Sequence, residues 1–349
     1  MKNQQAIKRG AVRTAPVALV GLAGLLALAG GSPALGGADN PKCHAPQYVF
    51  KAFDAPSAVQ PQVAGGGAFG INNRGQIVGN YVAKYAADGV TALVDAYVFQ
   101  HGVFTDVAVP DAVWTELLKI NDYGVAVGDY IDASDLTGSN PHFFIRGLDG
   151  AIHLLPPVMP DAVFEWLWAG INNQGTVVGT FVQTTGPLQG LFQGYIFQGG
   201  KYKVFNYPGA GMTTLQAIND CGTIAGFWVD VKGIPSDPNN PYYNGHGFLR
   251  HKDGRLVAVD MPGARDSGTL GATFPLGLNN KGEVVGEYVG TDNNFHGFLL
   301  SKGVYTTLDP PDSEGFSQAY DISEEGVVVG TYGSPLTHGF IAFPVRGRD

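Results

Sequence analysis

The chain has 349 residues, of which only 15% are charged, and its formal net charge is −9. An acidic chain without a basic cluster does not suit nucleic acid or anionic lipid, so neither is an expected partner. A content of 51 glycines and 44% hydrophobic residues indicates a folded, turn-rich protein and argues against disorder.

The first residues have the pattern of an export signal. Four basic residues precede an apolar run over residues 15–31, and small residues suited to signal peptidase follow at Ala34, Gly36 and Ala38. This order predicts a signal peptide over residues 1–37 and a secreted or periplasmic mature chain over residues 38–349. A transmembrane anchor is the alternative, but the run is short and glycine-rich for a span of about 20 residues. The mature chain is not expected to span a membrane.

One motif recurs through the mature chain. It reads Ile/Leu-Asn-Asn/Asp-x-Gly, then two apolar residues, a second glycine and an aromatic residue, with a degenerate last copy at Ile322-Ser323-Glu324-Glu325-Gly326. The second glycines are residues 79, 128, 179, 226, 286 and 330, so the period is 44 to 60 residues. Periods of this size are typical of propellers and solenoids.

Each copy predicts four short strands, here called a to d. The Asn-Asn/Asp-x-Gly segment is a tight turn between strands a and b, because Asn, Asp and Gly tolerate positive φ. Strand b is the β-branched run that follows, strand c carries a His-Gly-Phe-like signature, and strand d alternates in polarity and ends near a proline. No segment is typical of a long amphipathic helix.

The two ends of the chain favour a closed ring. The sixth copy stops after strand c, whereas residues 48–56 form a spare strand d near the N-terminus. Pairing of these two would leave no exposed sheet edge. We therefore expect a single all-β domain, a six-bladed β-propeller of four-stranded blades closed by the N-terminal strand. An open solenoid would need capping repeats, and a β-sandwich would not explain the period.

These paired motifs resemble the extracellular HAF repeat family of bacteria. The resemblance covers essentially all of the mature chain, although the first and third copies lack the strand-c histidine and the sixth lacks Asn-Asn. It implies an exported repeat protein with no established activity.

The strand-c histidines do not predict a metal site. They are His142, His246, His296 and His338. Equivalent positions on different blades should lie on the order of 15 Å apart, given strand spacings of about 4.8 Å, whereas zinc ligands lie about 2 Å from the metal. We expect each histidine to hydrogen-bond a neighbouring blade or turn.

The sequence contains no catalytic motif such as a nucleophile elbow or a phosphate loop. Acids outside the strands could supply a pair for sugar chemistry; they are Asp111, Glu116, Asp161, Glu165, Asp266, Asp312 and Glu314. Two oxygen-rich segments, residues 129–135 and residues 230 with 237–240, could hold Ca²⁺, although neither matches an EF-hand. No other cofactor is expected. Cys43 and Cys221 either form a disulfide or stay as two thiols.

The non-repeating loops are the best candidates for function, because a scaffold varies where it works. The b–c and d–a connections form one face, named the loop face, and the short a–b and c–d turns form the opposite turn face. The long loops span residues 83–95, 129–141, 183–193, 230–245 and 266–275, and they concentrate aromatic residues. The proposed binding residues are Trp114, Trp166, Trp168, Trp228, Tyr242, Tyr243 and Phe274; Phe164 and Phe316 lie nearby.

Three hypotheses follow. The first is a non-enzymatic, monomeric binding or scaffold module whose loop face takes a glycan or protein, since aromatic rings beside polar groups suit both. The second is a carbohydrate-active hydrolase or lyase with loop carboxylates. The third is a structural surface or matrix protein.

Overall fold

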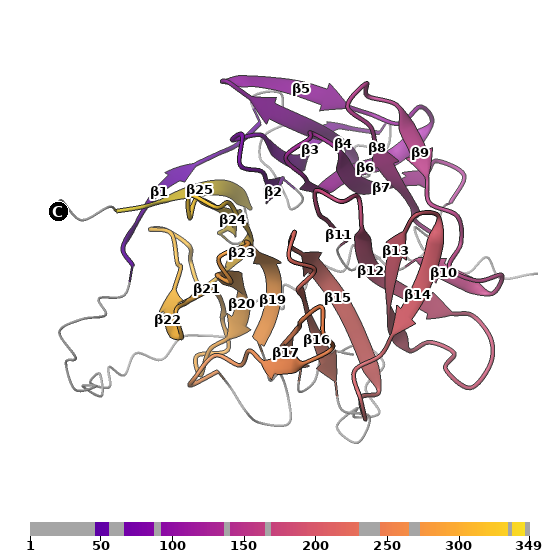
Figure 1. Ribbon diagram of the computed structural model, residues 1–349. Coiled ribbons are helices and arrows are strands. Elements are labelled where there is room, and N and C mark those ends of the chain that lie inside the picture. Colours follow the sequence, from indigo (N-terminus) through magenta and orange to yellow (C-terminus); the bar gives the residue numbers. More distant parts are fainter. Residues whose placement is uncertain are drawn as a thin grey trace, which may run out of the picture.

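A computed structural model describes residues 46–55, 66–86, 92–135, 140–164, 169–229, 245–264, 273–333 and 337–345. The regular structure in these ranges is β-strand throughout, arranged in antiparallel sheets around a common centre (Figure 1). The predicted all-β class is confirmed. The described residues contain no helix of the length and apolarity that crossing a membrane requires.

The described strands form five sheets, within which six antiparallel groups of strands, here called units, follow the sequence repeats. Units 1 and 2 belong to one sheet, joined by a parallel pairing of Val94 with Trp114. Unit 1 is β2 (Gly67–Ile71), β3 (Ile77–Tyr85), β4 (Ala92–Gln100) and β5 (Val103–Val107). Unit 2 is β6 (Ala112–Ile120), β7 (Ala126–Asp132), β8 (His142–Arg146) and β9 (Ile152–Leu154). Unit 3 is β10 (Ala162–Phe164) and β11 (Gly170–Ile171), which both pair with β12 (Val177–Gln183), then β13 (Phe192–Gln198) and β14 (Lys201–Phe205).

The remaining units repeat the pattern. Unit 4 is β15 (Met212–Ile218), β16 (Ile224–Val229), β17 (Gly245–Arg250) and β18 (Leu256–Ala258). Unit 5 is β19 (Thr273–Leu278), β20 (Val284–Val289), β21 (Phe295–Ser301) and β22 (Val304–Thr307). Unit 6 is β23 (Ser317–Ile322), β24 (Val328–Tyr332), β25 (His338–Pro344) and the N-terminal strand β1 (Tyr48–Ala52).

The N-terminal strand pairs with the last repeat, as the sequence predicts. β1 lies antiparallel to β25, from Tyr48 opposite Pro344 to Ala52 opposite Phe340. The strand is shorter than predicted, but the pairing continues past its end, because the Phe53 amide donates to the Gly339 carbonyl at 2.8 Å. Residue 56 lies outside the described ranges.

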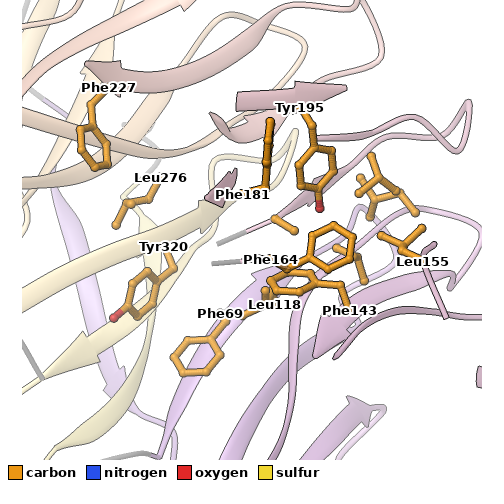
Figure 2. Packing of buried hydrophobic residues seen from close by; sticks show 14 of the residues in the cluster. Phe69, Leu118, Phe143, Leu155, Phe164, Phe181, Tyr195, Phe227, Leu276 and Tyr320 are labelled. Atoms are coloured by element: carbon orange, nitrogen blue, oxygen red, sulfur yellow. The ribbon is translucent and has the colours of Figure 1, made fainter. Parts of the chain in front are cut away.

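The first strands of the six units contact one another around the centre of the molecule. β2 lies beside both β6 and β23, and β11, β15 and β19 complete the succession. One apolar cluster draws residues from all six units, and Figure 2 shows part of it: Phe69, Leu118, Phe181, Phe227, Leu276 and Tyr320. Five of the six units have a first strand that is not split in two, and each of these strands contains a β-bulge. The bulge leaves one residue unpaired, and in four of the five strands that residue lies in this cluster. These residues are Phe69, Leu118, Leu276 and Tyr320. The centre of the fold, which we call the shaft, is therefore packed with side chains.

The predicted tight turns are present, and their first asparagine has two roles. In unit 1 the Asn72 Oδ1 accepts the amides of Arg74 and Gln76, each at 3.0 Å, while Gly75 takes a φ of 73°. The Asn72 Nδ2 donates to the Asn121 carbonyl of unit 2 at 2.8 Å. The same donation to the next unit recurs from Asn121, Asn172, Asn219 and Asn279. One side chain therefore shapes a turn and joins two units.

The second turn residue closes a ring of hydrogen bonds. In each unit its backbone amide donates to the second turn residue of the next unit, and Glu324 of unit 6 returns to the Asn73 Oδ1 of unit 1 at 2.7 Å. The residues alternate between amide and acid: Asn73, Asp122, Asn173, Asp220, Asn280 and Glu324. Asn173 Nδ2 donates to Asp122 at 2.8 Å and to Asp220 at 2.7 Å. The ring thus matches each carboxylate with amide donors, and strict alternation around it requires an even number of units.

The closing glycine of each motif permits close approach of strands a and b. A Cβ at Gly128 would lie 2.1 Å from the Glu116 carbonyl oxygen, and the same clash occurs at Gly79, Gly226, Gly286 and Gly330. Only glycine leaves room for this bulged pairing.

Replacing Asn173 with Asp should destabilise the fold. The substitution removes two donors and places a third carboxylate between Asp122 and Asp220. We expect the free energy of unfolding at pH 7 to fall by about 2 to 4 kcal/mol. Two hydrogen bonds to charged groups are lost, each worth roughly 1.5 to 3 kcal/mol, and solvent reduces their sum at this half-buried site. Urea titration measures the change. Gln174→Glu, which adds the same charge at the exposed neighbouring position, should stay within about 0.5 kcal/mol of the parent. Equal losses in both variants would contradict the role of the ring.

Candidate functional site

The predicted aromatic residues fall into three groups. Trp166, Trp168, Tyr242 and Tyr243 lie outside the described residues. Phe274 is only 6% exposed and packs edge-on against Phe227 with ring centres 4.8 Å apart, so it is a core residue here. Trp228 is half-buried between Tyr207 and His246, at ring distances of 4.9 and 4.8 Å. Trp114 is half-buried where β6 meets β4 of unit 1.

The strand-c histidines are kept apart, and each has an aspartate partner. His246, His296 and His338 bind the aspartate that follows strand d of the same unit, Asp260, Asp309 and Asp54 respectively. His142 instead binds Asp132 at 3.0 Å. The expectation was a neighbouring blade or turn; each partner lies in the same unit, in the connection after strand d or, for His142, at the end of strand b. In unit 3 the same pair of positions holds Gln193 and Asn206, which also hydrogen-bond each other. In units 3 to 6 these side chains bind strand c to the residue that follows strand d.

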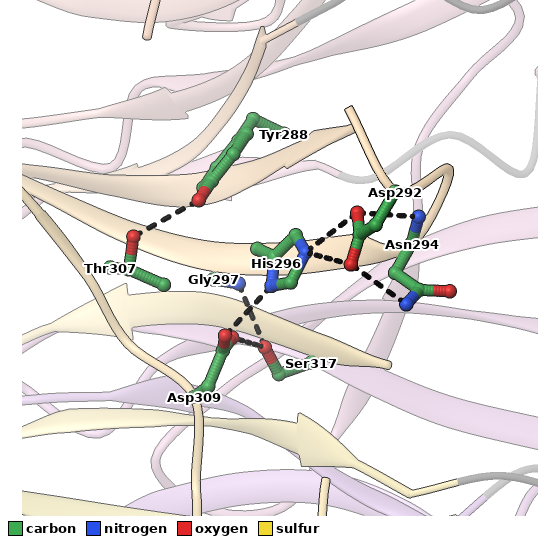
Figure 3. Close-up of polar contacts among 8 residues, drawn as sticks. All are labelled: Tyr288, Asp292, Asn294, His296, Gly297, Thr307, Asp309 and Ser317. Atoms are coloured by element: carbon green, nitrogen blue, oxygen red, sulfur yellow. Dashed lines mark hydrogen bonds and ion pairs between the residues drawn. The ribbon is translucent and has the colours of Figure 1, made fainter. Parts of the chain in front are cut away.

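His296 is the most strongly held of the four histidines (Figure 3). Its Nδ1 lies 2.7 Å from Asp309 and its Nε2 lies 3.2 Å from Asp292, and the ring stacks on Tyr288. The bonds to Asp309, followed by those to Asp292, raise the pKa of His296 to about 9 despite partial burial. The imidazole is therefore a charged structural link at neutral pH. Among the described residues, no group of three or more His, Cys, Asp or Glu side chains is arranged to hold a metal ion.

The acids proposed for calcium are dispersed. Asp132 binds His142, Asp135 accepts the Asn140 amide at 2.9 Å, and Asp129 lies on β7, fully buried, in place of the predicted loop position. The segment over residues 129–135 is thus not arranged as a calcium loop. The second segment, residues 230 and 237–240, lies outside the described residues, as does Cys43. Cys221 is exposed at the tip of a turn.

Two of the predicted acids meet in the shaft instead. Glu116 on β6 and Asp129 on β7 are direct cross-strand partners, 7% and 0% exposed. Asn80 Nδ2 of unit 1 donates to Glu116 at 3.0 Å, and the Trp114 indole lies near enough to Glu116 to lower its pKa. The Asp129 oxygens have no donor among the described residues except a proton on Glu116. Ionising both of these buried carboxyl groups would cost much free energy, because the two charges would repel each other. The pair therefore holds a shared proton.

Burial dominates the electrostatics of this pair. Removal from water raises the pKa of Glu116 to about 7, although the bonds from Trp114, Asp129 and Asn80 lower it. The pKa of Asp129 is raised well above its usual range by burial and then by Glu116. A third shaft acid, Glu287 on β20, has its pKa raised to about 7 by burial, and it accepts from the Gln318 side chain.

Tyr320 lies between the two acidic groups. Its hydroxyl donates to Gln318, and its pKa is raised by burial and by the charges of Glu287 and Glu116. Asn80, Asp129, Thr180, Glu287 and Thr331 all hold the repeat position directly after the closing glycine. Together with Glu116 and Gln318, these side chains form what we call the polar layer of the shaft, on the loop-face side of the apolar cluster.

The turn-face end of the shaft holds an ion pair that the sequence did not indicate. Lys119 of unit 2 lies 3.3 Å from Asp321 of unit 6, and it also donates to the Tyr320 carbonyl. The repeat positions equivalent to Lys119 and Asp321 are glycine or alanine in the other units, which leaves room for the pair; they are Gly70, Gly170, Ala217 and Gly277. A cavity of about 70 Å³ remains here, enough for about two water molecules and too small for a typical ligand site.

A larger cleft opens on the loop face between units 2 and 3. Its volume is about 440 Å³, within the range of small-ligand sites. The walls are mainly apolar, with two polar side chains; they include Asn140, Pro141, His142, Leu154, Pro156 and Phe164. Trp166 and Trp168 follow directly in the chain but lie outside the described residues. Phe164, which sequence analysis placed on this face, is the aromatic residue that the structure does bring to a cleft.

Comparisons with known proteins add a general likeness in fold. No family model matches the chain, and no curated protein is similar to it in sequence. The β-propeller domain of the Trilobed protease from Pyrococcus furiosus is 11% identical with a TM-score of 0.48, covering 80% of each chain. Putative TolB from Agrobacterium tumefaciens is 13% identical with a TM-score of 0.43, covering 76% of this chain and 89% of its own. A protein of unknown function from Dyadobacter fermentans is 9% identical with a TM-score of 0.49, covering 85% of this chain and 99% of its own. At these values no function is carried over.

The substitution Glu116→Gln should reduce the dependence of the free energy of unfolding on pH. Because the pKa of Glu116 rises from 4.5 to about 7 on folding, its neutral form stabilises the fold fully below about pH 4.5, and this contribution is lost as pH rises through 7. Glu116→Gln keeps a neutral side chain at every pH. As pH rises from 5 to 8, the free energy of unfolding should fall in the parent. We expect the fall to be smaller in the variant, by on the order of 2 kcal/mol.

Urea titrations at four pH values test this expectation. Glu314→Gln, at an exposed glutamate, is the matched control and should follow the parent. Parallel pH profiles for the parent and Glu116→Gln would show that Glu116 does not carry a folding-linked proton.

Proposed function

We propose that this chain is an exported, six-bladed β-propeller of the HAF-repeat type that acts as a non-enzymatic binding or scaffold module. The six units are its blades, and β1 closes the ring by completing the sixth. The hydrogen-bonded turns support closure, since the bond from Glu324 to Asn73 joins the last unit to the first. The basic and apolar N-terminal residues support export to the periplasm or the cell exterior.

The observation that carries the binding role is the loop-face cleft between units 2 and 3. A volume of about 440 Å³ with apolar walls and the polar groups of Asn140 and His142 suits a sugar ring or a side chain of a protein partner. His142 is held in place by Asp132 and by stacking on Tyr130 at 4.9 Å, so this wall is preorganised. We propose that a glycan or protein ligand binds here. Trp166 and Trp168, which follow Phe164 in the chain, stay proposed binding residues.

Hydrolysis is a second candidate, favoured by the Glu116–Asp129 pair. Glycosidase carboxyl groups stand about 5 to 10 Å apart to admit the sugar or a water. Glu116 and Asp129 instead stand directly opposite each other on neighbouring strands, and Asp129 is fully buried. This geometry suits a shared structural proton better than a reaction on a glycosidic bond. Turnover of any substrate in a polysaccharide panel, lost in Glu116→Gln, would favour the enzyme.

Removing β1 tests the closed ring. A chain that begins at residue 57 lacks the partner of β25 and exposes an unpaired strand edge, which promotes association. We expect a lower melting temperature and concentration-dependent oligomers in analytical ultracentrifugation. A chain that begins at residue 46 keeps β1 and should remain a monomer with the parental melting temperature. Identical behaviour of the two chains would contradict closure by this strand.

Two leucines of unit 2 provide a matched test of the cleft. Leu154 lines the cleft and is 56% exposed, whereas Leu148 is 75% exposed on a c–d turn of the turn face. For the tightest ligand found on a glycan array, we expect Leu154→Glu to raise the Kd at least tenfold, because a carboxylate is placed among apolar contacts. Leu148→Glu should leave the Kd unchanged. Equal affinities of both variants would place binding elsewhere, and a saturable protein ligand in place of any glycan would identify the other ligand class.

A further inference from the structure

We propose that the polar layer of the shaft is a second binding site, separate from the cleft, and that it accepts a protonated primary amine. The site is bounded by Glu116 of unit 2 on one side and Glu287 of unit 5 on the other, with Tyr320 between them. The ligand would approach from the loop face.

The first observation is an uncompensated set of acids. Glu116, Asp129 and Glu287 have no lysine, arginine or histidine partner among the described residues. Lys119 lies on the same strand as Glu116, but it is bound to Asp321 at the turn-face end of the shaft. The acids therefore lack a counter-charge that the fold itself could have supplied, and a cation from outside would provide it.

The second observation is a set of buried acceptors without donors. Asn80 is 1% exposed, and its Oδ1 has no hydrogen-bond partner although its Nδ2 binds Glu116. Both oxygens of Asp129 are likewise without a donor when the pair is ionised, and the Thr180 hydroxyl, at the equivalent position of unit 3, has no partner. Unpartnered buried polar atoms are costly, and they are rare in native proteins. The Gln216 amide and the Thr180 and Tyr195 hydroxyls are also buried without a partner, and they can donate as well as accept. The unpartnered atoms beside Glu116, Asn80 Oδ1 and both Asp129 oxygens, can only accept, so the ligand that complements them is a donor.

Among possible hydrogen-bond donors, a protonated amine matches the charge and the acceptors of this site best. An ammonium group presents three N–H donors and one positive charge on a compact head, and it has no acceptor that would oppose the carboxylates. A metal ion is less suitable, because the described acids are not arranged as a group that could hold one. A hydroxyl group supplies a single donor and leaves the charge uncompensated.

Exposure indicates how the ligand would reach the site. Glu287 and Gln318 are the partly exposed members of the layer, Glu116 retains 7% exposure, and Asp129 is fully buried. An amine would therefore contact Glu287 and Gln318 first and Glu116 at its deepest point. Asp129 acts through Glu116, by releasing or taking the shared proton.

The test compares amines with neutral analogues of the same shape. Isothermal titration calorimetry at pH 7.5 uses 1,4-diaminobutane against 1,4-butanediol, and glucosamine tetramer against N-acetylglucosamine tetramer. We expect both amines to bind more tightly than their neutral counterparts by at least tenfold. Binding should also strengthen as pH rises from 6 to 8, because the acids must ionise. Repeating the titration in two buffers of different ionisation enthalpy should show net proton release.

Variants then locate the amine. Glu287→Gln should weaken binding of the amine probes at least tenfold, and Glu116→Gln should reduce the proton release, whereas Glu314→Gln should bind as the parent does. Leu154→Glu, in the cleft, should leave amine binding unchanged, so failure of the cleft and failure of this site are distinguishable. Binding of the diol equal to that of the diamine, or equal loss in Glu314→Gln, would overturn the proposal. If only the tetramer of the two amines binds, the site requires an amino sugar; if only diaminobutane binds, it takes a free polyamine.

Discussion

The side-chain amide of the turn asparagine is the interaction on which the rest of the structure depends. Its oxygen closes the turn of its own unit, and its nitrogen binds the backbone of the next unit. A strand pair on its own is marginally stable, so each unit gains stability from its neighbours. The ring of alternating amides and acids beside it adds a condition on the number of units. In a ring with an odd number of units, two like residues would be neighbours, either two carboxylates that repel each other or two amides with no carboxylate between them.

The shaft is layered in a way that confines function to one face. The ion pair of Lys119 and Asp321 and the ring of turns occupy the turn-face end. Apolar bulge residues fill the middle, and the polar layer follows toward the loop face. Because every layer is occupied by side chains, the shaft does not offer a passage through the described part of the molecule. A ligand is therefore expected on the loop face, in the cleft or at the polar layer.

The polar layer carries a cost in stability. Glu116 and Asp129 stand directly opposite each other on neighbouring strands, an arrangement that is unfavourable for two like charges. Unit 5 has a second acid, Glu287, at the position of Asp129, but the other four units hold Asn, Thr or Phe, so the fold does not require an acid there. Protonation relieves the repulsion, and it leaves the pair ready to respond to pH or to a cation. Buried acids that are not needed for the fold are a recognised sign of a functional site.

The sequence by itself determined the all-β class, the turns and the pairing of the N-terminal strand, because each depends on local residue types and on a simple period. It also excluded the histidines as one metal site, since repetition separates them. Tertiary structure alone decided that Glu116 meets Asp129, that Phe274 is buried, and that Lys119 reaches Asp321. These outcomes depend on a one-residue bulge in the first strands, which sets which side chains enter the shaft, and on contacts between units far apart in the chain. The alternation of Asn with Asp or Glu was visible in the sequence, but its meaning required the closed hydrogen-bond ring, in which each residue faces two others.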